Sequence, residues 1–511
     1  MSTAAARSHT YDVAIIGCGP TGALLANLLG QAGLSVIVLE RDPGIHALPR
    51  AVHVDGEVMR IFQSVGLAER IAGIMRPSTQ GMHFINALGQ TLLIRRGIDG
   101  PGPQGWVNNW YGHQPLLDGT LREGLARFQN VKLRTGHEVT ALTVRDGGVD
   151  LAIRENFTGA TSEVSARFVV GCDGARSLVR QTMGSNQEDL GLHQPWLVVD
   201  LIVDPGSARA QALADHTIQL CDPARPMTLV NVAGGRRRWE IMLMPGDEVD
   251  SMTTPERIWP LLSRWIGPED ARIERAAVYT FHAVIARGWR RGQLMLAGDS
   301  CHQTPPFLGQ GMCAGLRDAA NLAWKLIRIV RRGASDSLLD TYESERRRHV
   351  AEFIRLAVDL GRTIQMTDPH AAADRDRSFA EGPPKQFDFP QPQLGPGVLD
   401  AGSSNRAEWP VGVAFPQPRL ADGRLLDAAT AGPAGPRFVL FSQHARITGL
   451  DAGMAARLAA LDIAVVADAN PTLAAWLAKH ACEAVLLRPD GYVMGLVRQR
   501  GNLQRLAAML P

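Results

Sequence analysis

The sequence lacks an excess of charge of either sign. Its 511 residues include 53 Lys and Arg against 51 Asp and Glu, so the formal net charge is only +2. Proteins that bind nucleic acid or an anionic membrane surface usually carry a strong basic excess or patch. The composition therefore predicts neither nucleic acid nor a membrane as a partner of this chain.

Paired cysteines are also missing. The six cysteines are far apart in the sequence and none forms a Cys-x-x-Cys motif. This spacing argues against a zinc ribbon, a thioredoxin-type redox centre and a disulfide scaffold. We expect reduced, mostly buried cysteines in a cytoplasmic protein that holds no metal ion.

A convincing membrane-spanning segment is absent as well. Residues 13–39 contain no charged side chain, and a run of that length could cross a bilayer. Six glycine or proline residues interrupt the run, and only residues 13–16 are apolar without a break before the first glycine. A buried strand, a glycine turn and a buried helix explain this pattern better than a membrane span or a signal segment.

What the sequence does contain is length and turn residues. A chain of this length predicts two or three domains. Its 45% hydrophobic and 20% charged residues are typical of globular proteins, and 52 Gly and 31 Pro are typical of an α/β protein with many tight turns.

Residues 11–40 have the pattern of a β-α-β unit that binds a dinucleotide. A strand at 11–16 is followed by Gly-x-Gly-x-x-Gly at 17–22, a helix at 23–31 and a second strand at 35–39. Gly17 permits the tight turn, Gly19 lets the backbone approach a pyrophosphate, and Gly22 lets the helix pack on the strand. Glu40 ends the second strand, where it can accept hydrogen bonds from a ribose. The unit alone is compatible with NAD or FAD, and a glycine turn that binds nothing is the competing interpretation.

Two later motifs bear on whether the unit binds a dinucleotide, and on whether that dinucleotide is NAD or FAD. Asp173-Gly174 follows a short strand at 168–170, and Gly298-Asp299 follows another at 293–296. Each dipeptide alone is a common turn, but both stand between a buried strand and a helix. Apolar residues from 316 to 330 recur with helical spacing, so a helix begins just after Gly309 and Gly311. Its positive end could stabilise negative charge on a bound ligand.

The three motifs together resemble the FAD-dependent aromatic hydroxylases, the single-component flavoprotein monooxygenases related to p-hydroxybenzoate hydroxylase and phenol hydroxylase. The resemblance covers residues 11–318. It implies FAD as the cofactor, with NADH or NADPH as a transient reductant, and O2. The FAD-binding residues that it implies are Gly17, Gly19, Gly22, Glu40, Arg41, Arg50, Gln114, Asp173, Gly298, Asp299, Pro306, Gly309, Gly311 and Met312.

The same resemblance implies a reaction. NAD(P)H reduces the flavin, O2 forms a flavin C4a-hydroperoxide, and its distal oxygen hydroxylates a phenol. Residues 49–62, 196–200 and 305–325 are similar to the 3-(3-hydroxyphenyl)propionate hydroxylases, so we expect that substrate or 3-hydroxycinnamate. Cys313 stands where the wider superfamily often has Asn, as in some members of that subgroup. Hydroxylases of resorcinol, nitrocatechol or aromatic polyketides, an FAD dehydrogenase or quinone reductase, and a non-catalytic binding protein are the alternatives.

The catalytic base is the least specific prediction. Asp55 falls where phenol hydroxylase has an acidic residue facing its substrate, and His53 is two positions away; either could equally be an ordinary polar residue. The predicted substrate pocket contains Tyr111, His113, Asp200 and Arg238. Arg238 could pair with a substrate carboxylate, or with Glu240 or another acid of the protein. We expect His302, beside Asp299, to orient its loop by hydrogen bonding.

The predicted fold is α/β (α+β overall). A Rossmann-like FAD-binding domain spans residues 1–185 and 281–380, interrupted by a mostly antiparallel substrate-binding sheet at 186–280. A proline-rich linker at 381–404 leads to residues 405–511, which resemble the thioredoxin-like C-terminal domain of phenol hydroxylase. Without Cys-x-x-Cys this domain cannot perform dithiol chemistry, so we expect it to serve packing or a homodimer contact.

Overall fold

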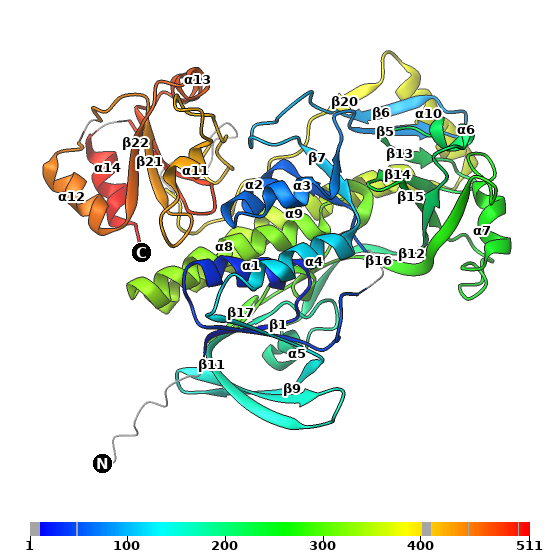
Figure 1. Ribbon diagram of the computed structural model, residues 1–511. Coiled ribbons are helices and arrows are strands. Elements are labelled where there is room, and N and C mark those ends of the chain that lie inside the picture. Colours follow the sequence, from blue (N-terminus) through cyan, green and yellow to red (C-terminus); the bar gives the residue numbers. More distant parts are fainter. Residues whose placement is uncertain (1–10, 47–49, 401–409, 448, 499) are drawn as a thin grey trace.

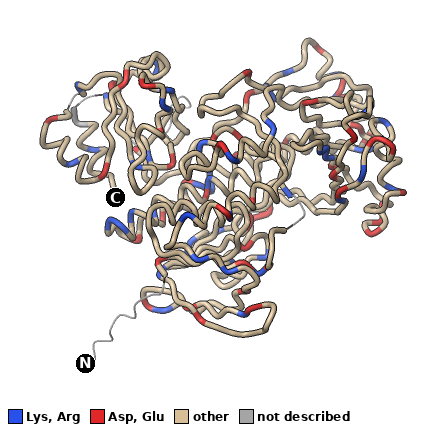
Figure 2. The backbone as a smooth tube through the Cα atoms, in the orientation of Figure 1, with Lys and Arg blue, Asp and Glu red and all other residues tan. Residues whose placement is uncertain are grey.

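The computed structural model describes residues 11–46, 50–400, 410–447, 449–498 and 500–511 (Figure 1). The FAD-binding domain lies in the centre, the large sheet on one side of it and the C-terminal domain on the other. Acidic and basic residues alternate along the chain without a zone of one sign (Figure 2). No helix in the described part of the chain is long and apolar enough to cross a membrane.

The central sheet confirms the Rossmann-like prediction. Its strand order is β17-β18-β11-β1-β2-β8, and the pairs from β18 to β8 are parallel. A run of buried β-branched residues forms β1, because both faces of this sheet are covered. The strands and nearby helices are β1 (Tyr11–Ile16), α1 (Pro20–Gln31), β2 (Val36–Glu40), α4 (Gln114–Leu125), β8 (Val131–Thr135), β11 (Thr161–Gly171), α5 (Leu178–Met183), β17 (Arg290–Arg291) and β18 (Leu294–Leu296). A hairpin of β9 (His137–Arg145) and β10 (Gly148–Glu155) extends β11.

The second sheet has nine strands and is mostly antiparallel, as predicted. Its order is β19-β16-β12-β15-β14-β13-β5-β6-β20. The strands are β5 (Met82–Asn86), β6 (Thr91–Arg95), β12 (Gln187–Val203), β13 (Thr217–Cys221), β14 (Met227–Val232), β15 (Arg236–Met242), β16 (Ala271–Ala286), β19 (His302–Gln303) and β20 (Lys385–Phe387). Strands β5, β6, β19 and β20 lie outside the 186–280 range of the sequence prediction, so the sheet recruits chain from both flanking segments.

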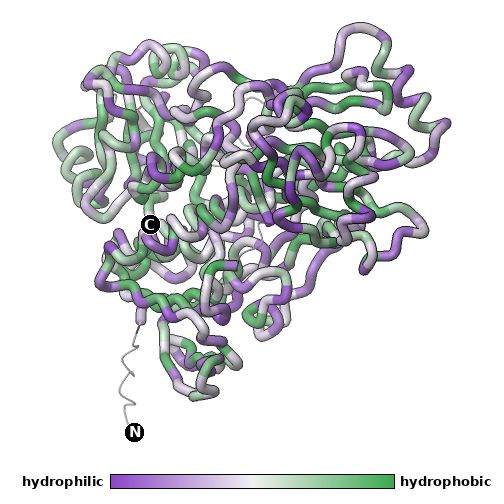
Figure 3. Tube along the Cα trace, turned by 45° about the vertical axis from the view of Figure 1, so that its right-hand side comes forward, coloured by the Kyte–Doolittle hydropathy of each residue, from purple (hydrophilic) through white to green (hydrophobic). Residues whose placement is uncertain are grey.

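Alternation along the strands gives this sheet two different faces. Leu197, Trp239 and Ile241 belong to an apolar core that also contains Ile258 and Leu262 of helix α7 (Pro255–Leu262). Arg238 and Glu240, which alternate with Trp239 and Ile241 on β15, therefore point to the opposite face. Figure 3 shows the resulting mixture of hydrophilic and hydrophobic positions along these strands.

Two long helices connect the parts of the molecule. Helix α8 (Gly311–Arg332) packs beside α1, and α9 (Asp340–Ile364) packs on α8 and on strands of the large sheet. Smaller elements complete this region: β3 (His53–Asp55), α2 (Gly56–Ser64), α3 (Ala68–Ala72), β4 (Met75–Pro77), β7 (Asn109–Gly112), α6 (Ala208–Gln211) and α10 (Pro369–Ala380).

The C-terminal domain has the strand order β22-β21-β23-β24. Strands β21 (Phe438–Ser442) and β22 (Ile463–Ala467) are parallel, whereas β23 (Ala484–Leu487) and β24 (Val493–Val497) add as antiparallel neighbours. With helices α11 (Leu426–Thr430), α12 (Ala452–Ala460), α13 (Pro471–Lys479) and α14 (Arg500–Ala508), this is a thioredoxin-like arrangement. Residues 401–404 of the predicted linker, and residues 405–409 beyond it, lie outside the described residues.

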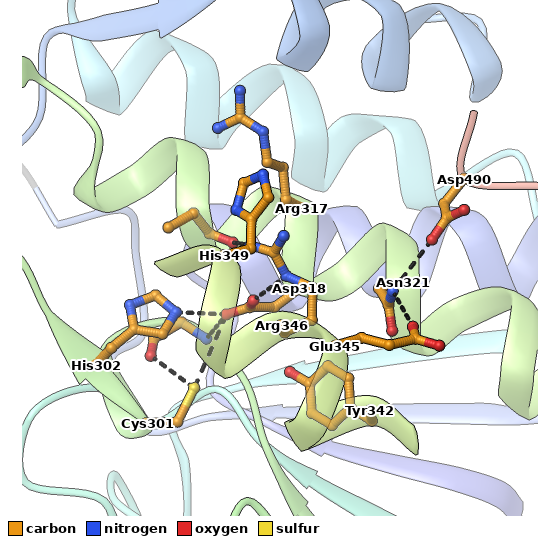
Figure 4. Close-up of polar contacts among 12 residues, drawn as sticks. Cys301, His302, Arg317, Asp318, Asn321, Tyr342, Glu345, Arg346, His349 and Asp490 are labelled. Atoms are coloured by element: carbon orange, nitrogen blue, oxygen red, sulfur yellow. Dashed lines mark hydrogen bonds and ion pairs between the residues drawn. The ribbon is translucent and has the colours of Figure 1, made fainter. Parts of the chain in front are cut away.

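A buried network of charges joins this domain to the FAD-binding domain. Glu345 on α9 accepts hydrogen bonds from Lys325 at 2.8 Å, Asn321 at 2.9 Å and Arg488 of the C-terminal domain at 2.9 Å. Asn321 also bonds Asp490 (Figure 4). Because Arg488 and the carboxylate of Glu345 are fully buried, the pair holds only while the two domains are in contact.

Candidate active site

The glycine turn before α1 leaves space for a ligand at one position and none at two others. Gly17 has φ +95°, and a Cβ atom there would lie 2.4 Å from the carbonyl oxygen of Cys172. A Cβ atom on Gly22 would lie 2.1 Å from the carbonyl oxygen of Gly17. At Gly19 no protein atom lies within 4 Å of the same position, so the backbone is open toward the cavity that it lines.

The sequence motifs meet around a single cavity of about 320 Å³. It lies between the carboxyl ends of the central strands, the start of α8 and the polar face of the large sheet, in the size range of small-molecule sites. The predicted site residues that line it are Gly19, Arg50, His53, Tyr111, Gln114, Arg238, Asp299, Pro306, Gly309, Gly311 and Met312.

Other predicted residues lie next to the cavity without lining it. Glu40 accepts hydrogen bonds from the backbone N–H groups of Cys18 at 2.8 Å and Asp42 at 3.0 Å. Asp173 accepts one from Val179, and its second oxygen is buried without a partner. The predicted site residues that do not line the cavity are Gly17, Gly22, Glu40, Arg41, Asp55, His113, Asp173, Asp200 and Gly298.

The cavity has the features that a flavin dinucleotide requires. The carboxylate of Asp299 is exposed toward it and makes no hydrogen bond to the described part of the chain, and desolvation by the surrounding protein raises its pKa, although His302 and Arg50 counteract this. The hydroxyl of Thr304, which lines the cavity, and the side-chain N–H2 of Gln310 are buried without partners. Two helix N-termini, at α1 and α8, add partial positive charge that suits phosphate and reduced flavin. The donors and acceptors present therefore fit FAD.

A hydrogen-bonded cluster fixes the turn that carries Asp299 (Figure 4). Asp318 on α8 accepts hydrogen bonds from His302 at 2.6 Å, Arg346 at 2.8 Å and the backbone N–H of Gly298 at 3.1 Å. This confirms that His302 orients its loop. Cys301, His302 and Asp318 are buried with their possible ligand atoms within 4.8 Å of one another, but Asp318 already accepts hydrogen bonds from His302 and Arg346.

Gln114 and Arg122 hold further segments of the chain around the cavity in place. The side-chain oxygen of Gln114 accepts the backbone N–H groups of Arg50 at 2.9 Å and Ala51 at 2.8 Å. Arg122 on α4 donates to the carbonyl of Cys18 in the glycine turn at 2.9 Å. Sequence reasoning missed Arg122. Its position two turns after Gln114 on the same helix could have indicated that both side chains reach the same site.

His53 and Asp55 occupy different environments. His53 lines the cavity, with Nδ1 3.0 Å from the carbonyl oxygen of Gly309 and Nε2 3.1 Å from the side-chain oxygen of Asn109. Burial, with the nearby charge of Arg95, lowers the pKa of His53 to about 4. The ring is therefore neutral at physiological pH, and both of its nitrogens face protein acceptors.

Asp55 does not line the cavity. Its carboxylate pairs with Arg317 of α8 at 2.7 Å and caps α2 by accepting the N–H of Val58 at 3.0 Å. Burial would raise the pKa of Asp55, but the charge of Arg317 outweighs it and holds the pKa below the ordinary value. This geometry favours a role in positioning α2 and α8, and it gives no support for Asp55 as the base.

Arg238 and Asp200 form a pair within the polar face of the large sheet. Nε and Nη2 of Arg238 donate to the two carboxylate oxygens of Asp200 at 2.7 and 3.0 Å, and the side chains are 1% and 5% exposed. Nη1 donates to the carbonyl of Arg50 at 2.9 Å. Of the alternatives for Arg238, an ion pair with an acid of the protein is the one present in the structure.

Glu240 is a cavity-lining residue that sequence reasoning considered only as an ion-pair partner. It lies two residues after Arg238 on β15, and its carboxylate is 3.7 Å from Nη1 of Arg238. Burial raises the pKa of Glu240 to about 6, although Arg238 opposes the shift. The alternation of polar and apolar residues from 238 to 241 was the signal that places it on the same face as Arg238.

Comparisons with known proteins agree with this site. Residues 10–357 match the family model described as FAD binding domain, and residues 434–510 match the HcaD C-terminal domain. The chain is 37% identical to a probable NADH-specific resorcinol 4-hydroxylase of Rhodococcus jostii (strain RHA1), covering 98% of this chain and 94% of the relative. It is 34% identical to a 3-(3-hydroxy-phenyl)propionate/3-hydroxycinnamic acid hydroxylase of Mycobacterium avium (strain 104), covering 96% and 90%.

The fold is shared with a solved structure of aklavinone-11 hydroxylase in a ternary complex with FAD and aklavinone. The TM-score is 0.79 at 21% identity, with 98% of this chain and 100% of that chain covered. A second solved structure, the flavin-dependent monooxygenase PieE with FAD and substrate, gives a TM-score of 0.80 at 22% identity, covering 98% and 99%. From its sequence and its fold, the chain belongs to the FAD-dependent aromatic hydroxylases.

Proposed function

We propose that this enzyme uses NADH or NADPH and O2 to add one hydroxyl group to a small phenol, beside the existing ring hydroxyl. The first candidates are 3-(3-hydroxyphenyl)propionate and 3-hydroxycinnamate, the compounds in the names of several relatives. The observation that carries the proposal is that one cavity joins the FAD motifs to the polar face of the large sheet. A phenol bound on that face would lie against the flavin.

The residues of the chain have separate tasks in this proposal. The open backbone at Gly19 and the N-terminus of α1 would hold the pyrophosphate, and Asp299 would accept hydrogen bonds from hydroxyl groups of the cofactor. Bound FAD supplies the transfer of two electrons from the nicotinamide to dioxygen. The start of α8, at Gly311 and Met312, would stabilise negative charge on the ring system. Glu40, Arg41 and Asp173 remain proposed cofactor contacts.

Apolar side chains would keep water from the reacting ring. Met82, Val230, Phe281 and Leu308 contribute to the cavity wall. Exclusion of water matters because reduced flavin and O2 otherwise yield hydrogen peroxide without product. His53 would position the loop at Gly309, which it contacts, and Tyr111 would position the neighbouring strand through its hydroxyl, which accepts from Thr217 at 2.9 Å.

Resorcinol is the second candidate, because one observation favours a phenol without a carboxylate. Among the described residues that line the cavity, the Arg and Lys side chains are Arg50 and Arg238. Arg238 is already bound to Asp200, so only Arg50 could pair with a propionate group. A neutral dihydroxybenzene needs no such cation.

The test starts from the purified holoenzyme and its flavin absorbance. NADH and NADPH oxidation and O2 uptake are followed with 3-(3-hydroxyphenyl)propionate, 3-hydroxycinnamate, resorcinol and 4-nitrocatechol, and products are identified by mass spectrometry. Substrate-stimulated O2 uptake with a product 16 Da heavier supports the proposal. Turnover with an electron acceptor under anaerobic conditions, without hydroxylated product, would instead identify a dehydrogenase or quinone reductase.

We further propose a cytoplasmic location, and a homodimer in which the C-terminal domain takes part. The domain boundaries at 185, 280, 380 and 404 are likewise proposals. Light scattering of the full-length protein tests the oligomeric state, and limited proteolysis tests the boundaries.

A further inference from the structure

Glu240 occupies the centre of the sheet face that lines the cavity. In the strand register it lies opposite Thr228 of β14 on one side and Val198 of β12 on the other. Thr228 donates to the side-chain oxygen of Gln219 at 2.6 Å, so that hydroxyl proton is not available to Glu240. The carboxylate is therefore surrounded by protein but borders the cavity.

The carboxylate of Glu240 also lacks a hydrogen-bond donor in the described part of the chain. The nearest cation, Arg238, donates to Asp200 and to the carbonyl of Arg50, and its contact with Glu240 is 3.7 Å long. Because Glu240 lines the cavity, a ligand bound there can donate the hydrogen bond that the protein does not. A ring hydroxyl of a phenol is such a donor.

Three other candidates for the base, His53, Asp55 and Asp299, are less suited to receive that proton. Both nitrogens of His53 face acceptors of the protein, and Asp55 is paired with Arg317 outside the lining. Asp299 lies on the turn after β18, on the side of the cavity where the FAD motifs meet.

We propose that Glu240 accepts a hydrogen bond from the hydroxyl group of the phenolic substrate and takes its proton as the ring is hydroxylated. The O–H bond of the phenol breaks, an O–H bond forms on the carboxylate, and the electron pair left on the phenol oxygen makes the neighbouring ring carbon more nucleophilic. This assignment rests on the proposed function, whichever phenol is the substrate.

The surrounding charges set the pH range of this step. Arg238 on β15 and Arg275 on β16 favour the ionised carboxylate, whereas Asp200 on β12 and burial oppose it, with the result that the pKa is about 6. Glu240 is therefore ionised above that pH. A free phenol has a pKa of about 10, so proton transfer is unfavourable before the ring reacts and is completed only as it reacts.

The first experiment compares the wild type with Glu240→Gln and Glu240→Asp, and with Glu163→Gln on the exposed part of β11 as the matched control. Removal of a general base is expected to lower the hydroxylation rate at pH 7 about 100-fold or more in Glu240→Gln. The acid limb near pH 6 should disappear, and the residual rate should rise with pH as the phenol itself ionises. Glu240→Asp should retain the acid limb at a lower rate. FAD content and thermal midpoint establish that each variant is folded.

The second experiment uses 4-nitrophenol, whose ionised form is yellow, as a binding probe without turnover. A nearby carboxylate raises the pKa of a bound phenol, so the probe should titrate at least about 1 pH unit higher in the wild type than in Glu240→Gln. Equal titration in both proteins, or an unchanged pH–rate profile in Glu240→Gln, overturns the assignment. If the wild type forms no hydroxylated product from any phenol, the proposed function fails instead.

Discussion

Replacing Asp200 with Asn tests the charge balance of the large sheet. The change removes the charge that neutralises Arg238 while both side chains stay buried. Breaking a buried ion pair by removing one partner costs about 3–5 kcal/mol. Because Glu240 at 3.7 Å and the carbonyl of Arg50 remain near Arg238, we expect the lower end, a loss of about 3 kcal/mol.

The same variant should alter the pH dependence of the reaction. Burial is the main cause of the raised pKa of Glu240, and Asp200 adds to it through repulsion. Without that repulsion the pKa of Glu240 falls, and so the acid limb of the pH–rate profile should move from about 6 to lower pH. The lower stability and the lower pKa of Glu240 both result from the loss of the Asp200 charge, so both must appear in this variant.

Both quantities can be measured on the holoenzyme. Thermal unfolding followed by circular dichroism should show a midpoint about 3–6 °C lower for Asp200→Asn, and steady-state rates from pH 5 to 9 give the acid limb. Asp146→Asn, in an exposed hairpin turn, is the control and should match the wild type. A stability loss below about 1 kcal/mol, or an acid limb that moves to higher pH, would refute the reasoning.

Three further predictions concern the cradle and the domain contact. Gly22→Ala should yield protein without bound flavin, because its Cβ would lie 2.1 Å from the carbonyl oxygen of Gly17. Gly44→Ala, where the Cβ meets open space, is the control and should stay yellow. A yellow Gly22→Ala protein would contradict the proposed FAD site. Arg488→Met leaves Glu345 with one cation fewer and should make the C-terminal domain cleavable at lower protease concentrations, and equal resistance would argue against the buried contact. Burial opposes ionisation of Glu345, but Arg488 and Lys325 hold its pKa at about 2, below the ordinary 4.5. The ionised carboxylate of Glu345 therefore stabilises the folded protein fully above pH 4.5, and this contribution is lost as the pH falls toward 2. In an acid titration, the free energy of unfolding of Glu345→Gln should fall less steeply with decreasing pH than that of the wild type.

Local sequence patterns predicted the parts of the structure that depend on local contacts. The glycine turn, its flanking strands and the helix after Gly311 follow from spacing and burial over short stretches. The thioredoxin-like order of the C-terminal strands also agrees with its resemblance. The inclusion of β5, β6 and β20 in the large sheet could not be predicted in this way, because their partners are far away in sequence and the pairing depends on tertiary contacts.

The site shows the same division. Tyr111 and His53 were identified by their neighbours in sequence and do line the cavity, but proximity in sequence could not tell that Asp55 faces Arg317 on α8. Arg238 was recognised as a charge without a known partner, and the competing acids Asp200 and Glu240 differ only in the strand that carries them. Which acid accepts the hydrogen bonds of Arg238 is decided by the register of β12 and β15, which places Asp200 opposite Arg238.

The order of the cradle along the chain has a consequence for biosynthesis. Most strands of the large sheet lie between the first glycine turn and the segment at 298–312, so a nascent chain presents the first half of the cofactor site long before the second. Until β18 has been synthesised and has paired with β11, that edge of β11 is unpaired and one side of the cofactor site is missing. We therefore expect cofactor capture only after residues 298–312 have left the ribosome.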